Sequence, residues 1–183
     1  MPEIYQPQED SYLMSENLRK EIPKLLKQNP QLKFLEIGAG SGINLVAAKE
    51  SGIKAENILG CDMNKDAVKH CQELGFNCVK SDLFSKIKGK FGIIAFNPPY
   101  LPRDINEPNG SRINTTGGAK GNELAIKFLK QSKKHLNKDG RIFLITSSLS
   151  SEIDFEKQGY KFREIGSTNM FFEKIYLWEL ESK

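Results

Sequence analysis

A glycine-rich segment between an apolar run and a helical run is the feature that most constrains the fold. Residues 32–37 are mostly apolar and predict a buried strand, and residues 43–49 predict a helix. Gly38, Gly40 and Gly42 lie between them. Glycine permits positive φ and lets a ligand approach the backbone closely. Strand, glycine loop and helix open a nucleotide-binding βαβ unit, and the G-x-G-x-G spacing differs from the pattern of nicotinamide-binding enzymes.

Acidic residues stand at or near the ends of the first three predicted strands. Glu36 precedes the glycine loop by two places, Asp62 ends the next apolar run, and Asp82 follows the third. A carboxylate about twenty residues beyond such a loop binds ribose hydroxyls, which makes Asp62 the candidate for that role. We expect Asp82 to accept a hydrogen bond from an adenine amino group while Leu83 packs on the ring.

The tetrapeptide Asn97-Pro98-Pro99-Tyr100 follows an apolar run at 91–96 that predicts a further buried strand. Two prolines fix φ and stiffen the turn. The Asn97 side-chain oxygen and the carbonyls of Asn97 and Pro98 are acceptors, and Tyr100 adds a flat face. Such a site suits a planar group with two N–H donors, an amide or the amino group of a base. The alternative is an ordinary proline-rich turn.

Together these motifs resemble those of class I S-adenosylmethionine-dependent methyltransferases that act on amide or amino nitrogens. The chain is most similar to HemK-type protein-(glutamine-N5) methyltransferases, in particular to the short eukaryotic and archaeal branch that acts on class I translation termination factors. Residues 5–11, the glycines at 117, 118 and 121, and residues 170–174 also fit that branch. Gln6 and Ser11 depart from it, standing where the branch has glutamate and threonine.

The resemblance implies S-adenosylmethionine as cofactor and a glutamine side-chain amide as methyl acceptor. The implied catalytic residues are Asn97, Pro98, Pro99 and Tyr100. The implied cofactor-binding residues are Ser11, Glu36, Gly38, Gly40, Asp62, Met63, Asp82, Leu83 and Asn97. We expect Asn97 and the Pro98 carbonyl to hold the two amide hydrogens, with no strong base near the tetrapeptide, and the segment around Ser11 to close over the cofactor as a lid.

Length and composition predict a single methyltransferase domain over 1–183, with an N-terminal helix and lid at 1–30 and a catalytic core at 31–183. Three cysteines without metal-ligand spacing indicate a reduced, cytoplasmic protein with no metal site. The absence of long apolar runs argues against a membrane partner. The net charge of +4 is modest. The lysines between 127 and 138 are interpreted as a solvated helix face, so no direct nucleic-acid binding is expected.

The predicted fold class is α/β: a Rossmann-like, mostly parallel seven-stranded sheet with helices on both faces and an antiparallel C-terminal strand. Asp10 or Ser11 is expected to cap the first helix, and Pro23 to interrupt it near its end. The predicted helices are 11–26, 43–50, 64–74, 121–136 and 150–157. The predicted strands are 33–37, 57–61, 76–79, 92–96, 141–146, 160–165 and 172–180.

Two further expectations concern surfaces outside the cofactor site. Residues 101–120 predict a long loop that borders the acceptor pocket and grips the acceptor, or else a disordered insertion. In the family's sheet order the strand at 76–79 lies at an open edge, where its mostly apolar side chains would suit a small zinc-binding activator protein. The alternative is that Lys80 protects this edge and the chain works alone.

Two other functions remain open from the sequence. One is an amino methyltransferase of nucleic acids, including N6-adenine, which can use the same tetrapeptide; the other is a catalytically silent cofactor-binding subunit. The chain carries no evident target-recognition domain, which base-modifying enzymes need to unstack their target. A silent subunit has no need of Asn97. Lysine also remains open as an acceptor.

Overall fold

The computed structural model describes residues 6–103, 115–170 and 172–183, and its centre is a seven-stranded sheet in the order β3-β2-β1-β4-β7-β9-β8. Strands β1, β2, β3, β4 and β7 run parallel, and β9 is antiparallel to both of its neighbours, β7 and β8. The strands are β1 (Phe34–Ile37), β2 (Ile58–Asp62), β3 (Asn77–Lys80), β4 (Phe91–Phe96), β7 (Leu136–Ser147), β8 (Tyr160–Met170) and β9 (Glu173–Ser182). The predicted fold class is confirmed.

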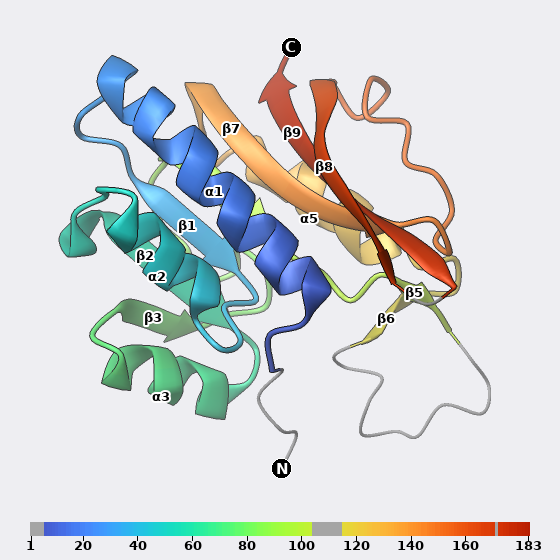
Figure 1. Cartoon of the computed structure of the whole chain (residues 1–183), viewed down its shortest axis with the longest axis horizontal. Helices are drawn as coiled ribbons and strands as arrows, with labels where there is room; N and C mark the ends of the chain where they lie inside the picture. The colour runs from blue at the N-terminus through green and yellow to red at the C-terminus, as the bar shows by residue number, and fades with distance from the viewer. Residues whose placement is uncertain (1–5, 104–114, 171) are drawn as a thin grey trace.

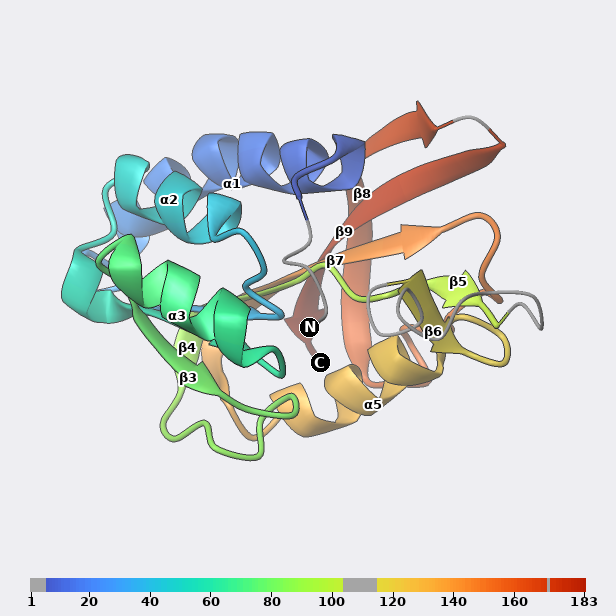
Figure 2. The same cartoon turned by 90° about the horizontal axis from the view of Figure 1, so that it is seen from below.

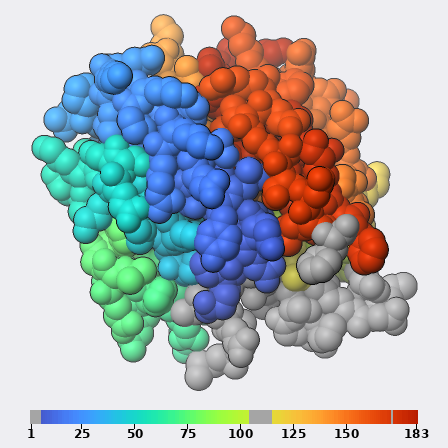
Figure 3. Space-filling model, in the orientation of Figure 1, coloured from blue at the N-terminus to red at the C-terminus, as the bar shows by residue number. Residues whose placement is uncertain are grey.

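Helices cover both faces of this sheet (Figures 1 and 2). The core on one side joins the sheet to α1 (Glu9–Gln28), α2 (Ile43–Glu50) and α3 (Lys65–Glu73), and the core on the other side joins it to α5 (Glu123–Ser132). Parallel strands buried on both faces are nearly continuously apolar: every residue of β1 and β4 is buried, and Glu36 is the one charged residue among them. Figure 3 shows α1 packed between α2 and the hairpin of β8 and β9.

Strand β1 shows how one strand serves both cores. The Phe34 side chain is buried with α1 and α2, whereas its neighbour Leu35 is buried with α5. Successive side chains of a strand point to opposite faces, so a four-residue strand joins the two layers. The carboxyl ends of the parallel strands therefore meet at one edge of a sheet that is packed on both sides, which is where parallel α/β folds place their ligand sites.

Three local predictions are wrong. Pro23 lies inside α1, which continues to Gln28, because Leu18 and Ile22 are buried against the sheet and hold the helix in place. Gln8, without a side-chain hydrogen bond, stands at the helix N-cap, so neither Asp10 nor Ser11 caps it. Residues 150–157 form turns instead of a helix.

Two strand regions in the second half of the chain also differ from the prediction. Strand β7 begins at Leu136 and contains an irregularity: Leu136 pairs with Phe91 and Arg141 with Ile93, so residues 137–140, between the predicted helix and the predicted strand, form a bulge within β7. A second sheet consists of the short parallel strands β5 (Leu101–Pro102) and β6 (Thr116–Gly118), which replace part of the long loop predicted at 101–120. Residues 104–114 of that loop lie outside the described residues.

Two observations concern the surface and the cysteines. Strand β3 stands at one end of the sheet order, as predicted for the partner edge. The apolar side chains expected at this edge are mostly buried and not on the surface: Val79 is 37% exposed, but Phe76 before the strand and Cys78 within it are buried.

All three cysteines are free and buried. Within the described ranges, no helix is long and apolar enough to cross a membrane.

Candidate active site

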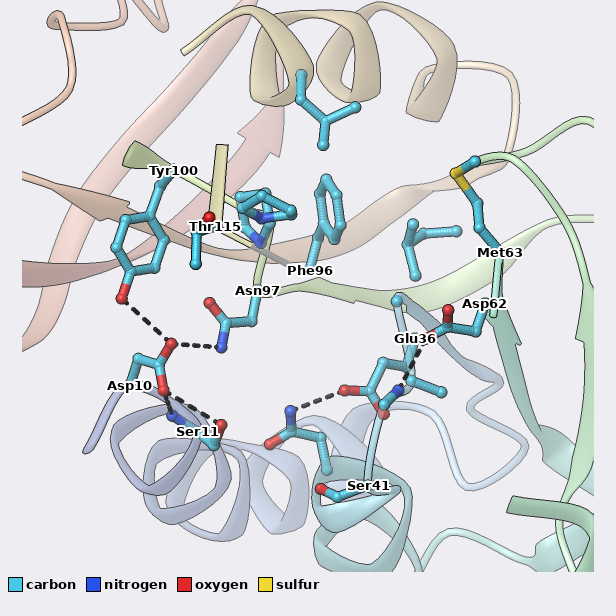
Figure 4. A pocket seen from close by; sticks show the side chains of 18 of the residues that line it. Asp10, Ser11, Glu36, Ser41, Asp62, Met63, Phe96, Asn97, Tyr100 and Thr115 are labelled. Atoms are coloured by element: carbon cyan, nitrogen blue, oxygen red, sulfur yellow. Dashed lines mark hydrogen bonds between the residues drawn. The ribbon is translucent and has the colours of Figure 1, made fainter. Parts of the chain in front are cut away.

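A cavity of about 310 Å³ opens at the carboxyl ends of the parallel strands, between the first turn of α1 and the loops that follow β1, β2, β3 and β4 (Figure 4). It contains every site residue predicted from the sequence. These are Ser11, Glu36, Gly38, Gly40, Asp62, Met63, Asp82, Leu83, Asn97, Pro98, Pro99 and Tyr100. Predicted site residues that lie as far apart in the sequence as Ser11 and Tyr100 thus line the same cavity.

The glycine loop and Asp62 are tied together. Gly38, Gly40 and Gly42 all have positive φ, between 50° and 78°, a conformation that other residues rarely adopt. The backbone N–H of Gly40 donates to Asp62 Oδ2 at 2.9 Å, and the backbone N–H of Asn64 donates to Asp62 Oδ1 at 2.8 Å. Each carboxylate oxygen has two lone pairs, so Asp62 retains the capacity to accept from a ligand.

Glu36 is a buried acid beneath the loop. Asn44 Nδ2 donates to Glu36 Oε1 at 2.8 Å, whereas Glu36 Oε2 has no hydrogen-bond partner among the described residues. Burial raises the pKa of the Glu36 carboxyl well above its ordinary value of 4.5, and the hydrogen bond from Asn44 only partly opposes this shift. An unpaired buried acceptor is costly, so this oxygen is suited to a donor from a ligand or from ordered water.

The loop after β3 carries the other predicted cofactor contacts. Leu83 is the one residue other than glycine with positive φ in the described parts of the chain, at 45°. The Ser81 hydroxyl donates to the Leu83 carbonyl at 2.8 Å and holds this strained backbone. Asp82 is half exposed and forms an ion pair with Lys127 at 3.3 Å.

At the other end of the cavity, Asp10 joins the tetrapeptide. Asn97 Nδ2 donates to Asp10 Oδ2 at 3.0 Å, and the Tyr100 hydroxyl donates to the same oxygen at 3.3 Å (Figure 4). Asn97 Oδ1 is buried and has no hydrogen-bond partner in the described structure. Asp10, expected as a helix cap, thus lies within the site as a hydrogen-bond acceptor for the tetrapeptide.

Glycines at 117 and 121 back the tetrapeptide. A Cβ at Gly117 would lie 2.5 Å from the Pro99 carbonyl oxygen, and a Cβ at Gly121 would lie 2.4 Å from the Tyr100 carbonyl oxygen. Real Cβ contacts of this length do not occur, so these positions require glycine. The pattern noted in the sequence thus holds the backbone behind the acceptor motif.

Sequence reasoning missed several residues that line the cavity. Asp10 had a signal, since it stands beside Ser11 in the N-terminal motif. Asn44 is the second residue of α2 and is recognisable only once its contact with Glu36 is known. Glu173, which accepts from the Ser147 hydroxyl, comes from β9 and lies within the 170–174 segment that fits the family branch, although no role was assigned to it. The remaining missed residues near the acceptor end include Phe96, Leu101, Thr115 and Met170.

The cavity is strongly acidic. Five carboxylates line it, and the described lining residues include no lysine, arginine or histidine. A ligand with positive charge is therefore favoured by the electrostatics of the site. The acidic residues are Asp10, Glu36, Asp62, Asp82 and Glu173.

The family model described as "methyltransferase small domain" matches residues 13–171, which is most of the chain. This chain belongs to the methyltransferase small domain family. A relative from Methanocaldococcus jannaschii, described as a putative protein N5-glutamine methyltransferase, is 36% identical over 159 residues, or 82% of this chain and 76% of the relative. The eRF1 methyltransferase catalytic subunit mtq2 of Schizosaccharomyces pombe is 28% identical over 78% of this chain and 72% of that protein.

A solved structure supports the fold of this methyltransferase. The E. cuniculi Mtq2–Trm112 complex, described as responsible for methylation of the eRF1 translation termination factor, matches with a TM-score of 0.67 and 22% identity, covering all of both chains. The resemblance to HemK-type methyltransferases predicted from the motifs is confirmed, as is the class I methyltransferase fold. The chain is thus an enzyme of a methyl-transferring family.

Proposed function

We propose that this methyltransferase transfers a methyl group from S-adenosylmethionine to the side-chain amide nitrogen of a glutamine in a translation termination factor. The observation that carries the proposal is Asn97 Oδ1, a buried acceptor without a partner that lies beside Tyr100 in the cavity. The names of the archaeal and fungal relatives supply the substrate class.

The residues of the cavity fit S-adenosylmethionine. Its sulfonium and ammonium groups are positively charged, and the lining is acidic with no described basic side chain. Asp62 would accept from the ribose hydroxyls, and Asp82 with Leu83 would hold the adenine. The N-terminus of α2 has no side-chain cap, so its free N–H groups suit the carboxylate. Ser11, Glu36, Met63 and the loop glycines complete the wall.

When bound, S-adenosylmethionine supplies the electrophilic methyl group. This chain's residues supply the acceptor geometry. Asn97 Oδ1 and the Pro98 carbonyl accept the two hydrogens of the glutamine amide, and Tyr100 and Pro99 confine its plane. Hydrogen bonds from both amide hydrogens to these two acceptors stabilise the positive charge that develops on the amide nitrogen as the methyl group is transferred. Positioning accounts for a large part of the rate.

The N-terminal part and the partner belong to the same proposal. We assign residues 1–30 as a lid over a core at 31–183 within one domain, because the first turn of α1 forms part of the cavity wall. We also place a small activator protein, zinc-binding as the resemblance implies, on the β3 edge. The similar E. cuniculi structure is a complex with Trm112, which supports a small partner protein, and the proposed place on the β3 edge rests on the sheet order. Free buried cysteines support a cytoplasmic location.

Methylation assays on matched substrates test the proposal. The purified chain, alone and co-purified with a candidate small partner, is incubated with labelled S-adenosylmethionine and either a termination factor, a termination factor with its glutamine changed to alanine, RNA or DNA. Label in the unmodified factor alone supports the proposal. Label in nucleic acid instead would move the assignment to the amino methyltransferases of nucleic acids.

A further inference from the structure

We infer that Asp10 is a positioning residue that fixes the orientation of the Asn97 side-chain amide, so that Oδ1 and not Nδ2 faces the methyl acceptor. This inference rests on the proposed function for the identity of the acceptor. It concerns the pair itself, however, and the pair can be examined with no acceptor present.

The amide of an asparagine has two faces of opposite chemistry. Nδ2 only donates and Oδ1 only accepts, and a flip of the group exchanges them. An ionised carboxylate only accepts. Because Asp10 Oδ2 lies 3.0 Å from the Asn97 amide, only the orientation with Nδ2 toward Asp10 gives a hydrogen bond. The opposite orientation would place two acceptors against each other.

The consequence is visible on the far side of Asn97. Its Oδ1 is buried, with no hydrogen-bond partner in the described structure. Leaving a buried acceptor unpaired is costly, so the arrangement is unfavourable for the free protein. A substrate N–H would remove that cost. Asp10 therefore keeps the acceptor atom of Asn97 presented to the cavity before any substrate arrives, which is preorganisation.

Asp10 is itself held firmly. It is 2% exposed and lies in the first turn of α1, where the helix dipole favours a carboxylate. Its two oxygens have separate tasks. Oδ1 accepts from the backbone N–H of Ser11 at 2.6 Å and from the Ser11 hydroxyl at 3.2 Å, and Oδ2 accepts from Asn97 and Tyr100. The carboxylate cannot turn toward one task without weakening the other.

This contact also joins two distant parts of the chain. Asp10 is 87 residues from Asn97 in the sequence and belongs to α1, whereas Asn97 ends β4. The acceptor group is thus correctly oriented only while the first turn of α1 lies over the cavity. The packing of α1 on the sheet and the orientation of the acceptor group are thereby linked.

A double-mutant cycle on the full chain tests the inference. Asp10→Ala is expected to lower kcat about 10- to 100-fold, the range for residues that orient a binding group. Asn97→Ala is expected to lower it by about 10²–10³. In the Asn97→Ala background, Asp10→Ala should lower kcat by a much smaller factor than it does in the wild type, because its main effect passes through Asn97 and only the contacts with Tyr100 and Ser11 remain to be lost. If the fold-losses in kcat of the two single variants multiply in the double variant, the inference is wrong.

Two further variants separate positioning from charge and from folding. Asp10→Asn has one accepting oxygen where Asp10 has two, so it should recover part of the activity that Asp10→Ala loses only to the extent that this oxygen faces Asn97 Nδ2 and slows exchange of the Asn97 amide protons. Recovered activity without slower exchange of those protons would contradict a positioning role. Glu9→Ala removes an exposed carboxylate from the same helical turn and should leave kcat unchanged.

A spectroscopic readout needs neither cofactor nor substrate. In ¹⁵N-labelled protein the side-chain amide of Asn97, assigned by its loss in Asn97→Ala, should exchange its protons with water more slowly in the wild type than in Asp10→Ala. If the Asn97 side-chain amide protons exchange equally fast in the wild type and in folded Asp10→Ala, the inferred hydrogen bond between Asp10 and Asn97 is wrong. If the wild type methylates no glutamine, the proposed function fails, while this measurement still decides whether Asp10 orients Asn97.

Discussion

The backbone N–H of Gly40 donates a hydrogen bond to the Asp62 carboxylate at 2.9 Å, which links the glycine loop after β1 to the end of β2. The carboxylate proposed to bind ribose therefore also fixes the loop that lies against the cofactor. Binding and loop geometry at this site are coupled through one side chain.

Asp62→Ala should weaken binding of S-adenosylmethionine and of its demethylated product by about 1–3 kcal/mol, the range for a lost hydrogen bond to a charged group. The loop contact adds to this loss because Gly40 and Asn64 both lose an acceptor. Isothermal titration calorimetry measures the change. Asp66→Asn, in the first turn of α3, is the matched control and should bind normally. Unchanged affinity in Asp62→Ala, or a preference for NAD, would contradict the cofactor assignment.

Glu36 predicts a specific dependence of stability on pH. Burial raises the pKa of its carboxyl in the folded state above the ordinary value of 4.5. As pH rises past that ordinary value, the unfolded chain releases this proton first, so the folded state binds more protons. The Glu36 contribution to the free energy of unfolding is therefore fully present below the ordinary pKa. It decreases as pH rises toward the folded-state pKa and does not change further above it.

Glu36→Gln cannot ionise and should remove this contribution. The free energy of unfolding, measured with urea between about pH 5 and pH 8, should fall less steeply in the variant, by at most about 1.4 kcal/mol per pH unit. Glu16→Gln, an exposed position of α1, should follow the wild type. Parallel curves for Glu36→Gln and the wild type would show that Glu36 ionises as freely in the folded protein as in the unfolded chain.

The β3 edge offers a test of the partner. Val79→Asp places a charge on the exposed part of the edge strand and should abolish co-purification of a small activator protein, because an added strand would have to bury that charge. Ser167→Asp, exposed on β8 at the opposite end of the sheet, is the control and should retain the complex. Size-exclusion chromatography after co-expression gives the result. A complex that survives Val79→Asp would place the partner elsewhere.

The core of the fold was predictable because its patterns are local. The apolar runs that form β1 and β4 and the helical run of α2 were predicted with bounds within one residue of the structure. The predicted helix at 150–157 is reduced to a single turn because a glycine ends it early. Asp154 accepts from the backbone N–H groups of Lys157 and Gln158, as at the start of a helix, but Gly159, with φ 84°, closes the turn by donating to the Glu156 carbonyl.

The site was predictable where motifs follow strand ends, and less so where distant segments meet. The glycine loop, Asp62 and the tetrapeptide converge because parallel strands bring their carboxyl ends to one edge. Asp10 was interpreted as a helix cap, which is the common role of an acidic residue at that position. Its true contacts with Asn97 and Tyr100 depend on how α1 crosses the sheet, which no local pattern encodes.

The most direct measurement of the central claim is mass spectrometry of a termination factor after incubation with this protein and S-adenosylmethionine. We predict one added methyl group on the side chain of a single glutamine, with Asn97→Ala slower by about 10²–10³ at nearly unchanged cofactor affinity. Absence of methylated glutamine under conditions where the chain binds the cofactor, or full methylation by Asn97→Ala, would contradict the account.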